Sequence, residues 1–199
     1  MTTALDLGPA TRRMADLVAN VPDGMLDAPT PCPAYSLGDL LEHVGGLALA
    51  FTAAATKTGL DDTQARPGDA SRLGDGWRAR IPGDLAKLAE AWRDPAAWTG
   101  MTSAGGIEMP GEIAGLVALN EVVVHGWDVA KAAGQPYDGD TASLEATREL
   151  VAQFGESDRE SGPTAAFGPV VEVPDHATLL DRVIGLNGRD PQWHSPRHR

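Results

Sequence analysis

Residues 110–133 read PGEIAGLVALNEVVVHGWDVAKAA, and the fold class follows most directly from this segment. Pro110 suits the first turn of a helix, and Gly134 is a residue type that commonly follows the last turn. The run between them is apolar nearly all the way round. Because a helix that is apolar on every face is buried on every face, the sequence predicts a central helix surrounded by other helices.

Three polar side chains interrupt this apolar run at helical spacing. Glu121, His125 and Asp128 are separated by four and three residues, so they project side by side from one stripe. A buried carboxylate without a partner costs several kcal/mol. Glu121 therefore needs a metal ion, a lysine or arginine from elsewhere, or His125 itself. The plainest alternative is a Glu121–His125 pair that only supports the helix.

Asp128 has alternatives of its own. It could orient His125 as an outer-shell carboxylate, since metal-bound imidazoles usually donate their second N–H to such a group. It could instead pair with an arginine from another part of the chain, or contact Lys131. The sequence identifies no catalytic residue. Asp128 is the candidate for a carboxylate that orients a metal ligand without binding the metal itself.

A second inward histidine favours a metal. His43 falls near the start of a helix expected over 36–57, on a stripe shared with Leu40, Gly46, Leu47, Ala50 and Ala54. The alternative is a core histidine with an ordinary hydrogen-bond partner. Two inward histidines and one glutamate form a His₂Glu set, which suits zinc with an open fourth position. The same ligands accept nickel, manganese or iron, so the ligand types leave the metal open.

Helical periodicity dominates the rest of the chain. We expect helices over 5–21, 36–57, 71–94 (broken near Pro82-Gly83), 110–133, 141–154 and 175–187. Ser36 and Asp39 have the spacing of a capping box, and Asp175 is the expected N-cap of the last helix. Segment 167–173 has strand-like character but is short. The predicted fold class is all-α, a helix bundle with a long loop at 58–70 and a second long loop or a short extended stretch at 95–109. We expect one domain over 1–190 and a polar tail over 191–199.

Composition narrows the classes of partner. The chain has 199 residues, 16 Lys and Arg against 28 Asp and Glu, and a net charge of −12. This balance argues against nucleic acid and against an anionic membrane surface as partners. No run of 18 apolar residues is free of charge, so we expect no transmembrane helix. The start of the chain lacks the pattern of a signal peptide and Cys32 is the only cysteine, so the expected location is the cytoplasm.

Several other side chains are of types that could take part in a site. Cys32, in the proline-rich loop before the His43 helix, is either a small buried side chain, a reactive thiol or an additional ligand. His176 is expected in the first turn of the last helix. Because His176, His194 and His198 share no patterned helix face with another candidate, we expect none of them in the site. The tryptophans are expected to anchor the core or an interface, with one or two walling a pocket: Trp77, Trp92, Trp98, Trp127 and Trp193.

Three stretches together resemble the DinB-like metal-binding proteins, in the group related to the N-terminal domain of mycothiol-dependent maleylpyruvate isomerase. They are TPCPAYSLGDLLEHVGGL (30–47), ALNEVVVHGWDVAKAAG (118–134) and FGPVVEVPDHATLLDRVIGLNGRDPQW (167–193). The resemblance implies a DinB-like four-helix bundle with one divalent metal. Its implied ligands in this chain are His43, Glu121 and His125. It also implies a low-molecular-weight thiol such as mycothiol, a small-molecule substrate and a homodimer.

The chain departs from this family pattern in two places. The isomerase carries a larger C-terminal domain that contributes to its active site, and residues 168–199 are too few to form it. We therefore do not expect maleylpyruvate isomerisation itself. Ala34-Tyr35 stands where relatives often have Gly-Trp after Pro-Cys-Pro, which changes a wall of the pocket.

The sequence is consistent with three functions. The first is a metal-dependent enzyme that uses a small thiol, a transferase or else an isomerase, in which the metal holds the sulfur as thiolate and Asp128 or a water manages protons. The second is a hydrolase whose metal activates water. The third is a protein that binds a metal or ligand without turnover.

Overall fold

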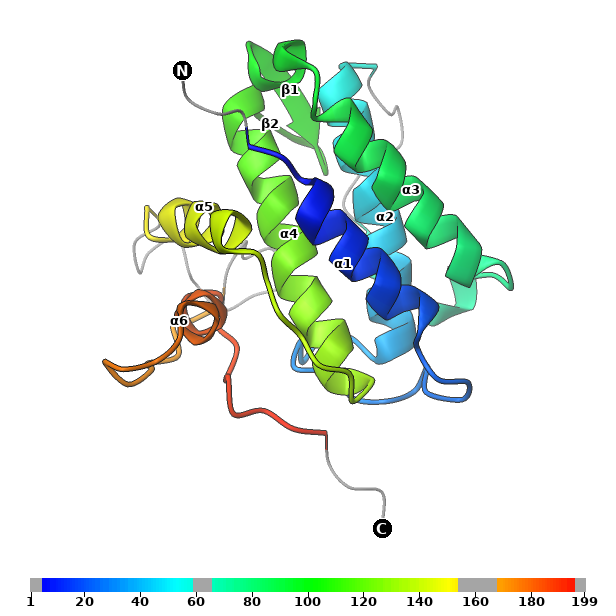
Figure 1. Cartoon of the computed structure of the whole chain (residues 1–199). Coiled ribbons are helices and arrows are strands. Elements are labelled where there is room, and N and C mark those ends of the chain that lie inside the picture. The colour runs from blue at the N-terminus through cyan, green and yellow to red at the C-terminus, as the bar shows by residue number, and fades with distance from the viewer. Residues whose placement is uncertain (1–4, 59–65, 154–167, 196–199) are drawn as a thin grey trace.

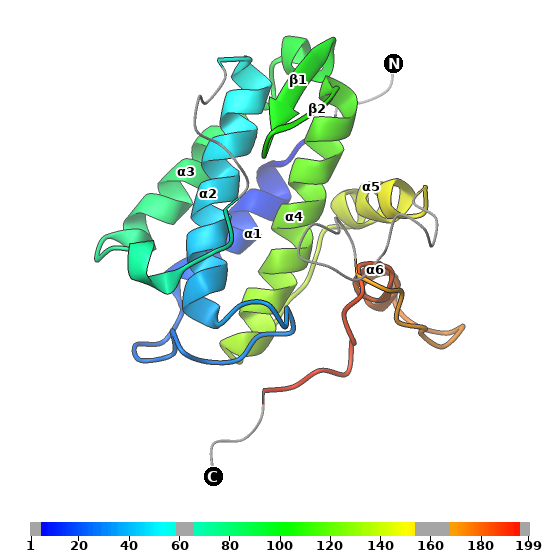
Figure 2. The ribbon, with the colours of Figure 1, turned by 180° about the vertical axis from the view of Figure 1, so that it is seen from behind.

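The computed structural model describes residues 5–58, 66–153 and 168–195. Four of its helices form a bundle: α1 (Gly8–Ala19), α2 (Leu37–Thr56), α3 (Trp77–Ala91) and α4 (Gly111–Ala132). Both α1 and α2 pack against α3 and α4 (Figure 1). On one flank, α5 (Thr141–Val151) packs on α4, and α6 (Leu179–Leu186) packs on α5 (Figure 2). The predicted all-α class and helix bundle are confirmed.

Helix α4 is the central helix that its sequence predicts. Its apolar residues are almost all buried, and Ala118, Leu119 and Val129 are fully enclosed. By length and hydropathy this helix could cross a membrane, but 78% of the apolar window is buried inside the protein. Its hydropathy therefore matches its place in the core of the bundle.

Helix α2 begins where the sequence predicts. The Ser36 hydroxyl accepts a hydrogen bond from the Asp39 N–H (3.2 Å), and the Asp39 carboxylate accepts one from the Ser36 N–H (3.0 Å). The hydrogen bond from the Ser36 side chain, followed by one from the Ala70 backbone, lowers the pKa of Asp39. This capping box starts the helix about two turns before His43 and so fixes where the helix that carries His43 begins.

Helix α3 differs from the prediction. It continues through Pro82 from Trp77 to Ala91, so the expected break is wrong. Pro82 removes one helical hydrogen bond. The buried face formed by Trp77, Ile81, Leu85 and Leu88 extends across that position, and tertiary packing of such a face supplies most of a helix's stability.

Most of the segment 95–109, expected to be a loop or a short extended stretch, forms a β-hairpin. A short 3₁₀ helix (Pro95–Trp98) leads into β1 (Met101–Ala104), which pairs antiparallel with β2 (Ile107–Pro110). Gly105 and Gly106 both have positive φ, as a tight two-residue hairpin turn requires. Pro110 ends β2 and precedes α4, and does not lie in its first turn as expected.

The last helix begins later than predicted. Thr178, not Asp175, is its N-cap, and Thr178 and Asp181 form a second capping box. His176 consequently lies in a turn before the helix. Residues 168–173 form no strand, although the Val171 N–H donates to the Gly185 carbonyl (2.9 Å).

Candidate metal centre

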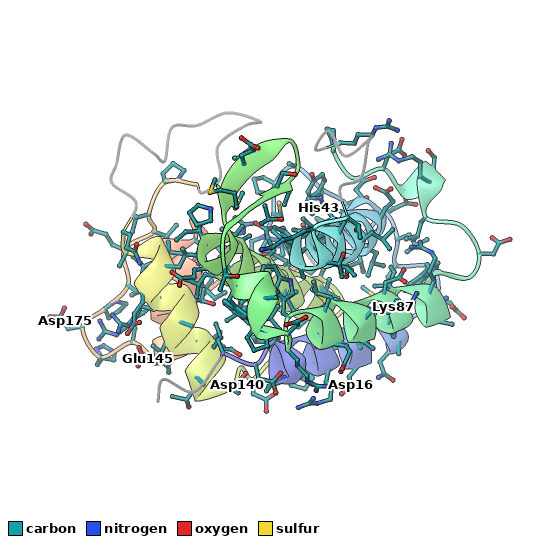
Figure 3. All side chains as sticks on the ribbon, turned by 90° about the horizontal axis from the view of Figure 1, so that it is seen from above. Asp16, His43, Lys87, Asp140, Glu145 and Asp175 are labelled. Atoms are coloured by element: carbon teal, nitrogen blue, oxygen red, sulfur yellow. The ribbon has the colours of Figure 1, made fainter. Side chains whose placement is uncertain are left out.

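Helices α2 and α4 bring the three predicted ligands together. One ligand atom each from His43, Glu121 and His125 lies within 4.8 Å of the other two. Glu121 Oε2 is 3.1 Å from His125 Nε2 and 3.9 Å from His43 Nε2. The side chains of His43 and Glu121 are 21% and 22% exposed, so the cluster lies at the edge of the core. Figure 3 shows His43 on the α2 side of the bundle, opposite Asp16 of α1.

The donor set fits a divalent cation. Ligands 2.0–2.2 Å from a tetrahedral zinc ion are separated by about 3.3–3.6 Å. The two measured separations, 3.1 and 3.9 Å, bracket this range, so small rotations of the side chains would enclose an ion. Two imidazoles and one carboxylate also match the ligand types of borderline metals. Both the chemical types of the donor atoms and their separations therefore suit a divalent cation.

Without an ion, Glu121 and His125 compensate each other. Burial opposes the charge on Glu121, but its interactions with the His125 and His43 side chains outweigh burial and lower its pKa well below the usual range. Burial also lowers the pKa of His125, but hydrogen bonds to Asp128 and Glu121 raise it overall to about 9. In the metal-free protein a proton on His125 therefore balances the Glu121 charge.

Asp128 combines two of the roles predicted as alternatives. Its side chain is fully buried, and Oδ2 lies 3.0 Å from His125 Nδ1. The same oxygen accepts a hydrogen bond from Arg189 Nη2 (3.3 Å). Lys131 does not take the third role, because its ammonium group lies over the Trp127 ring, 5.3 Å from the centroid. Because Nδ1 is engaged with Asp128, the other ring nitrogen of His125 faces Glu121.

Tyr35 and Gly68 hold the second histidine. The Tyr35 ring lies 5.0 Å from the His43 ring, whose other neighbour is the His125 ring at 5.1 Å. The backbone of Gly68 forms a hydrogen bond with Tyr35. A Cβ atom at Gly68 would lie 2.2 Å from the Asp39 carbonyl oxygen and 3.0 Å from the His43 Cβ. The chain can therefore pass this close to α2 only as glycine.

The remaining candidates do not join the cluster. Cys32 is buried, and burial raises its pKa, as expected of a small buried side chain and not of a reactive thiol. His194 is exposed and contacts the Gln192 carbonyl, and His198 lies outside the described residues. Trp77, Trp92 and Trp127 are core residues as expected. Most of the loop 58–70 also lies outside the described residues.

One small cavity reaches the cluster within the part of the chain that the structure describes. This narrow apolar cavity reaches Glu121 from the inside of the bundle, and its lining includes Leu47, Phe51 and Val122. Its volume is about 10 Å³, which is room for about one water molecule. A larger cavity of about 520 Å³ lies elsewhere, between α5, α6 and residues 170–173. Any ligand of the candidate metal would thus approach from the partly exposed side of His43 and Glu121.

Sequence reasoning missed Arg189 and Gly68 as parts of the site. Arg189 lies 61 residues from Asp128, and no periodicity links the two positions. The expectation that Asp128 could meet a distant arginine was correct but named no residue. Nothing in the composition of the loop around Gly68 marks its contact with α2.

Comparison with known proteins gives a consistent result. Residues 7–130 match the family described as "Mycothiol maleylpyruvate isomerase N-terminal domain". The chain is 30% identical over 181 residues to "Uncharacterized protein MT0763" and to "Uncharacterized protein Rv0738", from two strains of Mycobacterium tuberculosis. In both cases the similarity covers 88% of this chain and 91% of the relative. No solved structure matches the chain.

Proposed function

Because the chain belongs to the mycothiol maleylpyruvate isomerase N-terminal domain family, we propose that it is a metal-dependent enzyme acting with a small thiol. Its reaction would be transfer of the thiol to a small electrophile, or else an isomerisation assisted by the thiol. The thiol would be mycothiol or a compound of the same class. His43, Glu121 and His125 would hold one divalent ion, with zinc as the first candidate.

The observation that supports this proposal is the convergence of three donors from two helices at a partly exposed position. When bound there, the ion would lower the pKa of a coordinated thiol and so supply the nucleophilic thiolate. Glu121 is the one anionic ligand, so a divalent ion would keep one net positive charge among these residues. That residual charge favours an anionic fourth ligand such as a thiolate.

The other residues of the site have supporting roles in this proposal. Asp128 holds Nδ1 of His125, which leaves Nε2 free to bind. Tyr35 packs on the His43 ring and forms part of the wall on the exposed side. The apolar residues on the inner side of Glu121 exclude bulk water from behind the ligands.

The test combines metal content with thiol chemistry. The wild-type protein should bind one equivalent of zinc by elemental analysis and should consume mycothiol in the presence of a panel of electrophiles. His125→Ala should lose both properties, and it should lower the thermal stability of the zinc-treated protein. His194→Ala, which removes an exposed histidine outside the cluster, should keep both. A full equivalent of zinc on the His125→Ala protein would contradict the ligand assignment.

The same experiment separates the competing functions. Hydrolysis of esters or amides without added thiol would identify water activation by the metal as the chemistry. Bound zinc without turnover of any substrate would identify a binding protein.

We also propose that the protein is cytoplasmic and forms a homodimer that binds neither nucleic acid nor membrane. The family resemblance supports the dimer, and the acidic charge and single buried cysteine support the rest. Light scattering on the purified protein measures the oligomeric state directly.

A further inference from the structure

The end of α6 directs an arginine at the candidate metal centre. Gly188 has φ +74° and donates its N–H to the Gly185 carbonyl (3.0 Å), and the Arg189 N–H donates to the Ile184 carbonyl (3.1 Å). These two hydrogen bonds form a Schellman motif, which fixes the backbone just beyond a helix. The chain beyond α6 then runs toward the C-terminal end of α4 (Figures 1 and 2).

The Arg189 side chain is held at both ends of its guanidinium group. Nη1 donates to the Asn187 carbonyl (3.0 Å), and Nη2 donates to Asp128 Oδ2 (3.3 Å). Asn187 is itself buried and bonded to the Val183 carbonyl. The side chain of Arg189 is only 15% exposed, so it forms a mostly buried ion pair with a fully buried carboxylate.

Asp128 needs this partner because of where it lies. A buried carboxylate is strongly destabilising unless a positive charge or several hydrogen bonds compensate it. Its contacts with His125 and Arg189 both fall on Oδ2, and Oδ1 has no hydrogen-bond partner within the described structure. A metal-bound imidazole is neutral. Arg189 would then carry the positive charge that keeps Asp128 ionised and in place.

We propose that Arg189 is a positioning residue of the metal centre: it holds Asp128 in the orientation that fixes Nδ1 of His125, and so keeps Nε2 directed at the metal. This inference rests on the proposed function, because it needs His125 to be a ligand. It makes the segment after α6 part of the site, although that segment lies outside the residues 7–130 that match the family.

The experiment compares Arg189→Gln, Arg189→Lys and the control Arg182→Gln. Arg182 lies on α6 and donates to the backbone carbonyls of Asp175 and Ala177, and within the described residues it has no bond to Asp128, so its loss leaves Asp128 untouched. Zinc affinity is measured by competition with a chromophoric chelator, and the ligand geometry by the visible absorption spectrum of the cobalt-substituted protein. Thermal unfolding of the metal-free variants reports on the fold.

Arg189→Gln should weaken zinc binding about tenfold or more and alter the cobalt spectrum, as loss of an outer-shell partner does. Arg189→Lys should lose less zinc affinity than Arg189→Gln, and its cobalt spectrum should lie between those of the wild type and Arg189→Gln. The reason is that a lysine keeps the positive charge but lacks the planar guanidinium group. Arg182→Gln should match the wild type in both measurements.

Wild-type zinc affinity and an unchanged cobalt spectrum in Arg189→Gln would overturn this inference and leave the proposed function standing. If Arg189→Gln does not fold, Arg189→Lys decides, and wild-type behaviour in that variant overturns the inference. Absence of zinc binding by the wild-type protein itself would overturn the proposed function, and this inference with it.

Discussion

Replacing Asp128 with asparagine isolates the charge of the buried Asp128–Arg189 pair. Asparagine has nearly the same shape, and its oxygen can occupy the position of Oδ2 and accept from both His125 and Arg189. Its amide nitrogen then falls at Oδ1, which has no hydrogen-bond partner in the described structure. The hydrogen bonds are thus kept, and the negative charge is the main loss.

The expected cost follows from burial. Removing one partner of a fully buried ion pair costs about 3–5 kcal/mol, because the other charge is left uncompensated. The Arg189 side chain is 15% exposed and would keep its hydrogen bond to Asn187, so we expect Asp128→Asn to lower the free energy of unfolding by about 2–3 kcal/mol. For a chain of this size that corresponds to a fall in Tm of about 5–10 °C.

The assay is denaturant unfolding of the metal-free protein, with Asp23→Asn as the matched control. Asp23 also pairs with an arginine, Arg78, at 2.7 Å, but its side chain is 96% exposed. An exposed pair of this kind should leave the free energy of unfolding unchanged within error. The double variant with Arg189→Gln should cost less than the sum of the two single variants, since the residues are in contact. Equal, negligible effects of Asp128→Asn and Asp23→Asn would refute the reasoning.

Three further predictions concern the site and its surroundings. The pKa of His125 is raised to about 9 in the metal-free protein, above its unfolded value of about 6.5. Its stabilising contribution is therefore complete below pH 6.5 and is lost as the pH rises to 9, so the Tm of the metal-free protein should fall across that range and show no such fall in His125→Ala. Gly68→Ala should lower both the Tm and the zinc affinity, because the added Cβ would meet the Asp39 carbonyl oxygen. The control Gly46→Ala adds a Cβ with nothing within 4 Å and should stabilise α2 by about 0.5–1 kcal/mol. Equal Tm values for the two variants would contradict the close contact at Gly68. Cys32→Ser should keep its full equivalent of zinc, since Cys32 lies outside the cluster, and a loss measured by elemental analysis would make Cys32 a ligand.

The sequence predicts contacts within a helix better than contacts between segments. Glu121, His125 and Asp128 share one face of α4 because their spacing is that of the helix, and helix geometry needs no knowledge of the fold. The position of His43 depends on how α2 packs against α4, and its apolar stripe predicts only that it points inward. Arg189 depends on the path of α5, α6 and a turn, which no local pattern specifies.

Two features of the secondary structure, the hairpin and the start of the last helix, have local sequence signals that compete with others. Gly105-Gly106 is a strong hairpin signal, but the flanking residues are too few and too mixed to show the alternation of a strand. Thr178 and Asp181 have the capping-box spacing, yet Asp175 is also a good N-cap residue in the same segment. In the structure Thr178 takes this role, and Asp175 lies in a turn before the helix. The sequence alone allows either cap.

The division of the site between the two parts of the chain bears on how such a site can diverge. All three proposed ligands lie within residues 7–130, the part that matches the family. The charge that balances Asp128 comes from Arg189, in the later part. In this proposal the first part carries the metal ligands, and the orientation of His125 depends on a separate segment. A change in the path of that segment would alter the geometry of the proposed metal centre without any substitution among its ligands.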